Sequence, residues 1–346
     1  MQSGASSRAT RSLAVLDQRA RPLRDLRVSV TDRCNFRCGY CMPRSRFGKG
    51  FQFLPRAEIL SFEELARLAA LFVRLGVEKL RLTGGEPLLR AELPTLVRML
   101  AGLPGADVAL TTNGSLLEAQ AGVLAAAGLG RVTVSLDSLD DAAFRRMNDA
   151  DFPVARVLTA IDAAAAHGLG PVKINAVVRR GYNDATLVDM ARHFRGSGHI
   201  VRFIEYMDVG TSNGWRLDEV VSGREIVERI GAELPIEPLE PSYRGEVARR
   251  WRYRDGSGEI GVITSVTQPF CGDCTRARLS ADGKLYTCLF AASGTDLREP
   301  LRAGASDAEL EALLRSVWGA RSDRYSEIRS GETRSSPRAE MSYLGG

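Results

Sequence analysis

Residues 25–41 read DLRVSVTDRCNFRCGYC, a short hydrophobic strand that runs directly into a loop with three cysteines. The predicted strand is Leu26–Thr31, and Cys34, Cys38 and Cys41 follow it with spacings of three and two residues. Three thiolates in one loop can hold three irons of a [4Fe–4S] cluster and leave the fourth iron without a cysteine. Because an open metal position is typical of catalytic sites, this stretch predicts a strand that leads into a catalytic iron–sulfur site.

Further β-rich runs follow this strand and alternate with helical segments. The helical segments are rich in Ala and Leu, and one of them, residues 62–76, begins with the capping sequence Ser61-Phe-Glu-Glu. Strand–helix alternation at this spacing predicts βαβ units and a parallel sheet. Residues 24–235 are therefore expected to form a partial (βα)6 TIM-like barrel of the α/β class. The further strands are expected at Lys79–Thr83, Val108–Thr112, Val132–Leu136, Val172–Val178 and Val201–Tyr206.

These strands alternate polar and apolar residues, although buried parallel strands are usually continuously hydrophobic. On the second strand Lys79, Arg81 and Thr83 share one face, while Leu80 and Leu82 share the other. The apolar face must pack on the helices, so the polar face is expected to line a wet, charged lumen. Lys79 could instead extend from the base of its strand into solvent. The same alternation places Thr133, Ser135 and Asp137 together, and likewise Lys173 and Asn175.

The pattern changes after residue 208, and residues 236–346 are predicted to form a hairpin-rich C-terminal domain. A short helix is expected after Ser222, and the Pro-rich residues 235–241 are interpreted as a linker. Two hairpins follow, one around residues 255–258 and one around residues 282–283. A helix over about 306–318 then precedes a polar tail.

Composition and charge limit the class of protein. The 346 residues are 44% hydrophobic and 26% charged, as in ordinary soluble globular proteins, and no apolar run approaches the length of a membrane span. The basic residues 1–23 do not resemble a secretory signal and are expected to be a disordered tail, with a transit peptide as the alternative. The net charge of +5 could come from this tail or from a patch that binds a polyanion. Composition does not choose between them.

All six cysteines belong to two triplets, and the second is Cys271-x2-Cys274-x13-Cys288. Without a secretory signal, we expect a reducing, cytoplasmic location, in which cysteines bind metal more often than they form disulfides. A zinc site would need a fourth ligand, and no histidine lies near the first triplet in the sequence. The close spacing of two cysteines in the second triplet also suits convergence on one metal centre.

The first triplet, with Tyr40 before its last cysteine, resembles the cluster motif of the radical S-adenosylmethionine (radical SAM) superfamily. That resemblance implies reductive cleavage of SAM at the open iron, with Tyr40 beside the adenine. Residues 83–87, Thr-Gly-Gly-Glu-Pro, resemble the segment that binds the methionine amino group, with Glu86 supplying the negative charge. The other positions that match SAM-binding residues are Gly85, Ser135 and Met207, although Met207 could equally be core packing.

The second triplet lies in the sequence Pro-Phe-Cys-Gly-Asp-Cys-Thr-Arg-Ala-Arg, which resembles the MoaA family, the GTP 3′,8-cyclases of molybdenum cofactor biosynthesis. The resemblance runs from about Arg24 to Gly346. It implies a lyase with two [4Fe–4S] clusters and SAM, which converts GTP to (8S)-3′,8-cyclo-7,8-dihydroguanosine 5′-triphosphate. The free iron of the second cluster would face the guanine. The matching motifs are Gly-Gly-Glu-Pro-Leu-Leu-Arg (84–90), Thr-Thr-Asn-Gly (111–114), Ser-Leu-Asp-Ser (135–138), Arg-Phe-Ile-Glu-Tyr-Met (202–207) and the terminal Gly-Gly.

The same resemblance implies a GTP site built largely from cations. Arg202 is implied as catalytic support, although strict strand alternation would put it and Met207 on opposite faces. Gly345 and Gly346 would reach into the active site, whereas terminal glycines are ordinarily frayed. The positions that match GTP-binding residues are Arg27, Arg81, Thr112, Lys173, Arg276, Ala277 through its backbone, and Arg278.

The implied partners are GTP, an unidentified electron donor and cyclic pyranopterin monophosphate synthase as acceptor of the product. Neither a membrane nor nucleic acid is expected, and a homodimer is left open. Two other functions are alternatives. A peptide-modifying radical SAM enzyme would generally carry more additional cysteines. A basic nucleic-acid-binding protein would need four-ligand metal sites and aromatic–basic surface stripes, and neither is evident in the sequence.

Overall fold

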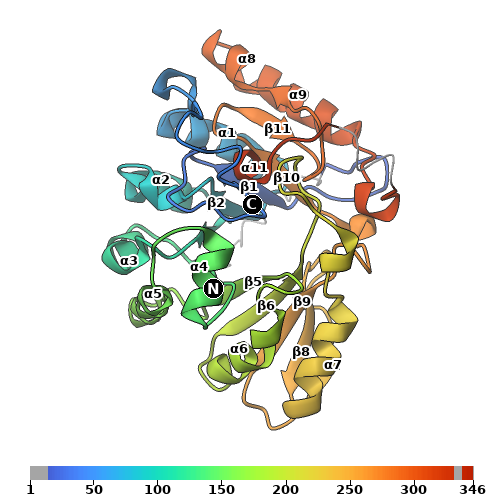
Figure 1. Cartoon of the computed structure of the whole chain (residues 1–346). Helices are drawn as coiled ribbons and strands as arrows, with labels where there is room; N and C mark the ends of the chain where they lie inside the picture. The colour runs from blue at the N-terminus through green and yellow to red at the C-terminus, as the bar shows by residue number, and fades with distance from the viewer. Residues whose placement is uncertain (1–14, 331–336, 346) are drawn as a thin grey trace, which may run out of the picture.

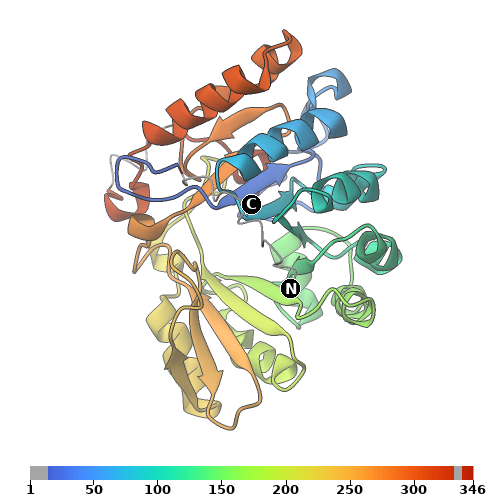
Figure 2. The ribbon, with the colours of Figure 1, turned by 180° about the vertical axis from the view of Figure 1, so that it is seen from behind.

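A single curved sheet of twelve strands organises the part of the chain that the structure describes, residues 15–330 and 337–345. The structure is a computed structural model. The strand order is β12-β11-β10-β1-β2-β3-β4-β5-β6-β9-β8-β7. Helices cover the outer face of the sheet, and strands from the C-terminal part of the chain lie at both of its ends (Figures 1 and 2). The concave face is left for the functional site.

The six predicted parallel strands are confirmed, each within two residues of its expected bounds. They pair in chain order, and every pair is parallel. The predicted alternation also holds, because Leu80 and Leu82 are fully buried under the helices while Arg81 lies on the concave side. The strands are β1 (Asp25–Ser29), β2 (Lys79–Thr83), β3 (Asp107–Thr112), β4 (Arg131–Ser135), β5 (Lys173–Val178) and β6 (Ile200–Glu205).

The C-terminal strands extend this same sheet. Strand β10 (Arg276–Leu279) pairs with β1 in parallel, and β9 (Glu259–Ile263) pairs with β6 in parallel. The two predicted hairpins are present as β8 (Arg249–Tyr253) with β9 and β10 with β11 (Lys284–Tyr286). The predicted linker at 235–241 is wrong, because β7 (Ile236–Leu239) pairs with β8 as an edge strand, where a proline is tolerated. The two domains predicted on either side of residue 235 therefore share one sheet. Its edge strands are β7 and β12 (Thr295–Asp296).

Side-chain caps mark the start of four described helices, α1, α4, α7 and α9. The Ser61 hydroxyl accepts a hydrogen bond from the backbone N–H of Glu64, and the Glu64 carboxylate accepts one from the backbone N–H of Ser61, so the predicted capping box is confirmed. No described helix is long and apolar enough to cross a bilayer. The helices are α1 (Phe62–Arg74), α2 (Leu93–Ala101), α3 (Leu117–Ala126), α4 (Asp141–Asn148), α5 (Val154–Ala166), α6 (Leu187–Phe194), α7 (Gly223–Glu233), α8 (Arg298–Arg302), α9 (Asp307–Gly319) and α11 (Met341–Leu344).

Residues 15–23 are ordered, so the prediction of a disordered tail through residue 23 is wrong for this part. Leu16 and Pro22 form an antiparallel bridge, and Leu23 is buried in the core. Asp17 and Arg21 are also buried, and their charges neutralise each other in an ion pair of 2.6 Å. The remainder of the predicted tail, residues 1–14, lies outside the described residues.

Candidate active site

One cavity of about 320 Å³ lies on the concave side of the sheet and contains both predicted metal sites. Cys34, Cys38 and Cys41 line it from the loop after β1. Cys271, Cys274 and Cys288 line it from the segments next to β10 and β11. The topology explains the convergence, because β1 and β10 are neighbours in the sheet. Two triplets that lie far apart in the sequence thus line one cavity.

The donor set fits iron–sulfur clusters. All six cysteines are free of disulfides and only partly exposed. Within residues 15–330 and 337–345, no three His, Cys, Asp or Glu side chains converge on a site for a single metal ion. A cube does not need such convergence, because each thiolate binds a different iron. The residues therefore suit a three-cysteine cluster at each triplet better than a mononuclear metal.

The pair Gly84–Gly85 lets the segment after β2 approach the first cysteine loop. A Cβ at Gly85 would lie 2.3 Å from the carbonyl oxygen of Arg33, and one at Gly84 would lie 2.6 Å from that of Thr31. The backbone N–H of Gly85 donates to the Thr31 carbonyl at 2.8 Å. The glycines are thus needed for packing against the cluster loop, and Gly85 also lines the cavity as predicted.

The predicted SAM-binding side chains lie together at this end of the cavity. The Tyr40 hydroxyl donates to Asp137 Oδ2 at 2.9 Å, and the backbone N–H of Val177 donates to Asp137 Oδ1 at 2.9 Å. Burial raises the pKa of Asp137 to about 6. Ser135 and Met207 also line the cavity, so Met207 is not simply core packing.

Glu86 does not face the cavity, so the expectation that its carboxylate meets a ligand ammonium is wrong. Its side chain is fully buried, and it accepts hydrogen bonds from the Thr112 hydroxyl at 2.7 Å and from the backbone N–H of Asn113 at 2.7 Å. Burial raises the pKa of Glu86 to about 7. Glu86 therefore joins the loops after β2 and β3. Thr112 lines the cavity, but its hydroxyl proton is already used in this bond.

Arginines surround the second triplet. Arg276 Nη2 donates to the Cys274 sulfur at 3.4 Å, and both Arg276 and Arg278 line the cavity. Burial alone would raise the pKa of Cys274, but the charges of Arg276 and Arg321 lower it to about 6. Burial and the charge of Arg276 lower the pKa of Arg278 to about 10. This end of the cavity is thus strongly electropositive.

The other predicted cations line the lumen between the two triplets. Burial lowers the pKa of Arg27, with further lowering by Arg278 and Arg81. Burial lowers the pKa of Lys173 to about 8, and the nearby Arg202 adds to this. Among the described residues, ten Arg and Lys side chains line the cavity against five Asp and Glu. Lys79 is one of them, and it pairs with Asp25 at 3.3 Å rather than extending to solvent.

Arg202 and Met207 both face the cavity, so the conflict between their positions is resolved. Strand β6 ends at Glu205, and strict alternation need not continue beyond it. Arg202 Nη2 donates to the Thr133 hydroxyl at 3.3 Å, as Arg81 Nη1 does at 3.2 Å. Burial lowers the pKa of Arg202 to about 9.

The C-terminal segment enters the site as far as it is described. Gly345 lines the cavity with a φ of +74°, and a Cβ there would lie 2.0 Å from Thr83 Oγ1. Gly346 lies outside the described residues. Ala277 is not among the lining residues, because its methyl group packs in the core opposite Leu26. A contact of its backbone with GTP stays a prediction.

Sequence reasoning missed several lining residues. Arg21 was assigned to the tail, and Arg321 and Asp323 to a segment without motifs, yet all three line the cavity beside the second triplet. Tyr243 and Arg250 line it near β8. The one available signal was the charge excess of residues 1–27, which belongs in part to this site.

Two family models match consecutive parts of the chain. The Radical SAM superfamily matches residues 28–194, and Molybdenum Cofactor Synthesis C matches residues 199–327. A GTP 3′,8-cyclase of Acidothermus cellulolyticus is 60% identical over 91% of this chain and 89% of its own length. A GTP 3′,8-cyclase of Xanthomonas axonopodis pv. citri is 51% identical over 95% of this chain and 98% of its own length.

Solved structures resemble this chain in fold. Streptococcus suis SuiB bound to S-adenosylmethionine matches with a TM-score of 0.60 and 14% identity, over 90% of this chain and 71% of that one. SuiB bound to its precursor peptide SuiA gives the same TM-score and identity over 85% and 67% of the two chains. At this identity the likeness concerns the arrangement of strands and helices only.

Proposed function

The chain belongs to the GTP 3′,8-cyclase family of the radical SAM superfamily, and on that premise we propose that it converts GTP into (8S)-3′,8-cyclo-7,8-dihydroguanosine 5′-triphosphate. This reaction is the first step of molybdenum cofactor biosynthesis. The observation that carries the proposal is the single cavity, which is lined by both cysteine triplets and by an excess of buried cations. That arrangement suits two iron–sulfur centres with a polyanionic substrate between them.

The first triplet would hold the SAM-binding cluster, and the second a cluster that binds the guanine of GTP. When bound, the first cluster and SAM would supply the radical chemistry that the cyclisation of GTP requires. The role of the protein would be to bind the reactants and orient them in the cavity. Tyr40, Gly85, Ser135 and Met207 line the cavity and would bind SAM.

Buried cations support the binding of a triphosphate. Such a group carries about four negative charges and needs several Arg or Lys partners in a site of low dielectric. Arg27, Arg81, Lys173 and Arg202 supply them in the lumen, and Arg276 and Arg278 beside the second triplet. In the described residues the Nε atoms of Arg202, Arg276 and Arg278 are buried without a hydrogen-bond partner. An unpartnered buried donor costs about 1–3 kcal/mol, so a bound acceptor would relieve it.

Gly345 supports a role for the C-terminal segment in the reaction. It lies against Thr83 and Gly84, next to the SAM end of the cavity. Glycine suits this position because any side chain would collide with Thr83. We expect this segment to close the cavity around the substrate.

The remaining parts of the proposal concern partners and location. A one-electron donor must reduce the first cluster, and cyclic pyranopterin monophosphate synthase would accept the product. The free cysteines and the oxygen-sensitive clusters that they would hold suit a reducing cytoplasm. The assembly could be a homodimer.

Anaerobic reconstitution tests the proposal. The wild-type protein should bind about eight irons, as two cubes require, and form 5′-deoxyadenosine and cyclised nucleotide only with GTP. Cys38→Ser should abolish SAM cleavage. Cys274→Ser should retain about four irons but form no cyclised product. About four irons in the wild-type protein, or turnover indifferent to GTP, would refute the proposal.

A further inference from the structure

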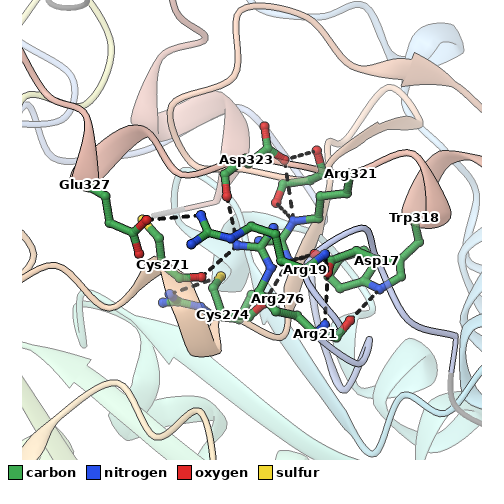
Figure 3. Close-up of polar contacts among 11 residues, drawn as sticks. Asp17, Arg19, Arg21, Cys271, Cys274, Arg276, Trp318, Arg321, Asp323 and Glu327 are labelled. Carbon is green, nitrogen blue, oxygen red and sulfur yellow. Dashed lines mark hydrogen bonds and ion pairs between the residues drawn. The ribbon is translucent and has the colours of Figure 1, made fainter.

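Three charged residues form a buried cluster against the loop of the second triplet (Figure 3). Asp17 Oδ2 accepts from Arg21 Nε at 2.6 Å and from Arg321 Nη1 at 3.1 Å. The side chains of all three are at most 1% exposed. Burying three charges is costly unless each is paired, so the cluster calls for an explanation beyond stability. We call it the Asp17 clamp.

The clamp holds the backbone around all three cysteines of the second triplet. Arg21 Nη1 donates to the carbonyl of Cys271 at 2.7 Å, and Arg321 Nη1 donates to the carbonyl of Cys274 at 2.8 Å. Arg321 Nε donates to the carbonyl of Thr287, the residue before Cys288, at 3.1 Å. One carboxylate thereby couples two guanidinium groups that fix three separate parts of the triplet.

The segment that carries Asp17 and Arg21 is itself locked in place. The Trp318 indole N–H donates to the carbonyl of Arg21 at 3.1 Å. Asp17 Oδ1 accepts from the backbone N–H groups of Arg19 and Arg21, both at 2.9 Å. The two family models match from residue 28 and from residue 199, so neither match includes this segment.

Arg21 has one more donor than the described residues use. Its Nη2 atom is buried and has no hydrogen-bond partner among them, although the side chain lines the cavity with Cys271 and Cys274. Hydrogen bonds to thiolate and sulfide sulfurs stabilise the reduced, more negative state of an iron–sulfur cluster and raise its reduction potential. A buried, unpartnered guanidinium nitrogen beside two cysteines is placed to make such a bond.

We propose that the Asp17 clamp is the positioning unit of the second iron–sulfur cluster: it fixes the cysteine loops, and Arg21 donates a hydrogen bond to the cluster and raises its reduction potential. The inference rests on the proposed function in one respect, the assignment of Cys271, Cys274 and Cys288 to a cluster. It adds residues 15–23 to the catalytic apparatus through their effect on that cluster.

The test uses the full chain with Cys34, Cys38 and Cys41 changed to Ser, so that only the second cluster can form. After anaerobic reconstitution, iron content, circular dichroism and a redox titration followed by electron paramagnetic resonance are measured for this parent and for Arg21→Gln. We expect Arg21→Gln to hold about four irons. Its midpoint potential should lie about 59 mV below that of the parent, which corresponds to a tenfold lower ratio of reduced to oxidised cluster for one electron.

Arg19→Gln is the matched control, because Arg19 lies in the same segment but pairs with Glu327 at the surface. It should leave the midpoint unchanged. Arg21→Lys keeps the charge and should shift the midpoint less than Arg21→Gln does. If Arg21→Gln is folded but loses its iron, this result would support the part of the proposal in which the clamp fixes the cysteine loops. The redox titration would then be made with Arg21→Lys.

The outcomes separate the two proposals. If the parent itself binds no iron, the assignment of the second triplet fails and with it the proposed function. If the parent binds about four irons, and the Arg21 variants that retain the cluster have the same midpoint potential as the parent, the clamp proposal is overturned. The proposed function then still stands. An equal shift in Arg19→Gln would likewise overturn the clamp proposal.

Discussion

Gly345→Ala tests whether the C-terminal segment acts from inside the active site. Alanine at a φ of +74° costs about 1–2 kcal/mol. The new methyl group would also lie 2.0 Å from Thr83 Oγ1. Thr83 is 2% exposed and donates to the carbonyl of Val28, so it has little room to yield. Crowding of this kind costs a further ~1–3 kcal/mol. Together these terms lower the docked fraction of the segment relative to the undocked one by at least about 30-fold.

Gly256→Ala is the control, because Gly256 has a φ of +77° and no atom within 4 Å of a built Cβ. Gly256→Ala therefore places alanine at a similarly unfavourable φ, but its methyl group meets no neighbouring atom. Carboxypeptidase digestion and GTP-dependent formation of 5′-deoxyadenosine are measured for both variants. We expect faster digestion and at least tenfold slower turnover in Gly345→Ala only, with similar melting temperatures. If digestion and turnover of Gly345→Ala stay within twofold of those of Gly256→Ala, the segment does not act as inferred.

Three further predictions concern charged residues. Burial lowers the pKa of Lys173 to about 8, so the affinity of the free enzyme for GTP should fall as pH rises from 7 to 8.5. Equilibrium dialysis should show a smaller fall in Lys173→Arg, where Arg202, with a pKa of about 9, still loses part of its charge; parallel curves would contradict the assignment. Asp208 is a buried carboxylate that Arg329 contacts at 3.0 Å and Arg338 at 2.9 Å. Asp208→Asn should therefore lower the free energy of unfolding by about 3–5 kcal/mol in chemical denaturation. A loss under about 1 kcal/mol would show that stability does not depend on these ion pairs. Burial raises the pKa of Glu86 from 4.5 to about 7, so the folded state binds more protons in this range and Glu86 should lower stability by up to ~3 kcal/mol as pH rises from 4.5 to 7. Glu86→Gln should reduce the slope of stability against pH in denaturation curves and leave the part that Asp137 contributes, whose pKa is also raised; an unchanged slope would refute the assignment.

The parallel strands and their two faces could be predicted because period-two alternation is a local property of the sequence. Arg81 and Leu82 were placed on the correct faces of β2 from that pattern alone. The six candidate cysteine ligands were predicted from their spacing and from the resemblance. Strand β7 was missed because a proline argues against a strand unless the strand lies at an edge, and the position of an edge depends on pairing between distant segments.

The same limit applies to the site. Glu86 was misassigned because its sequence context does not show that Thr112 and Asn113, from another loop, bury and bind its carboxylate. Arg21 was missed because a basic segment reads as a tail unless its acidic partner and its distant contacts are known. Asp17 lies four residues before Arg21, but Arg321 lies 300 residues after it. Short-range patterns do not reveal such partnerships.

The parallel pairing of β1 with β10 fixes the distance that a substrate must span between the two cysteine triplets. The first cysteine loop follows β1, and the second triplet adjoins β10, with Arg27 opposite Arg278 in the ladder. A slip of one residue would turn Arg276 and Arg278 from the cavity into the core and abolish the electropositive end. The span between the two cysteine triplets is therefore set by backbone hydrogen bonds within one sheet. Nucleotides that do not match this span cannot be accommodated by swinging one domain against another.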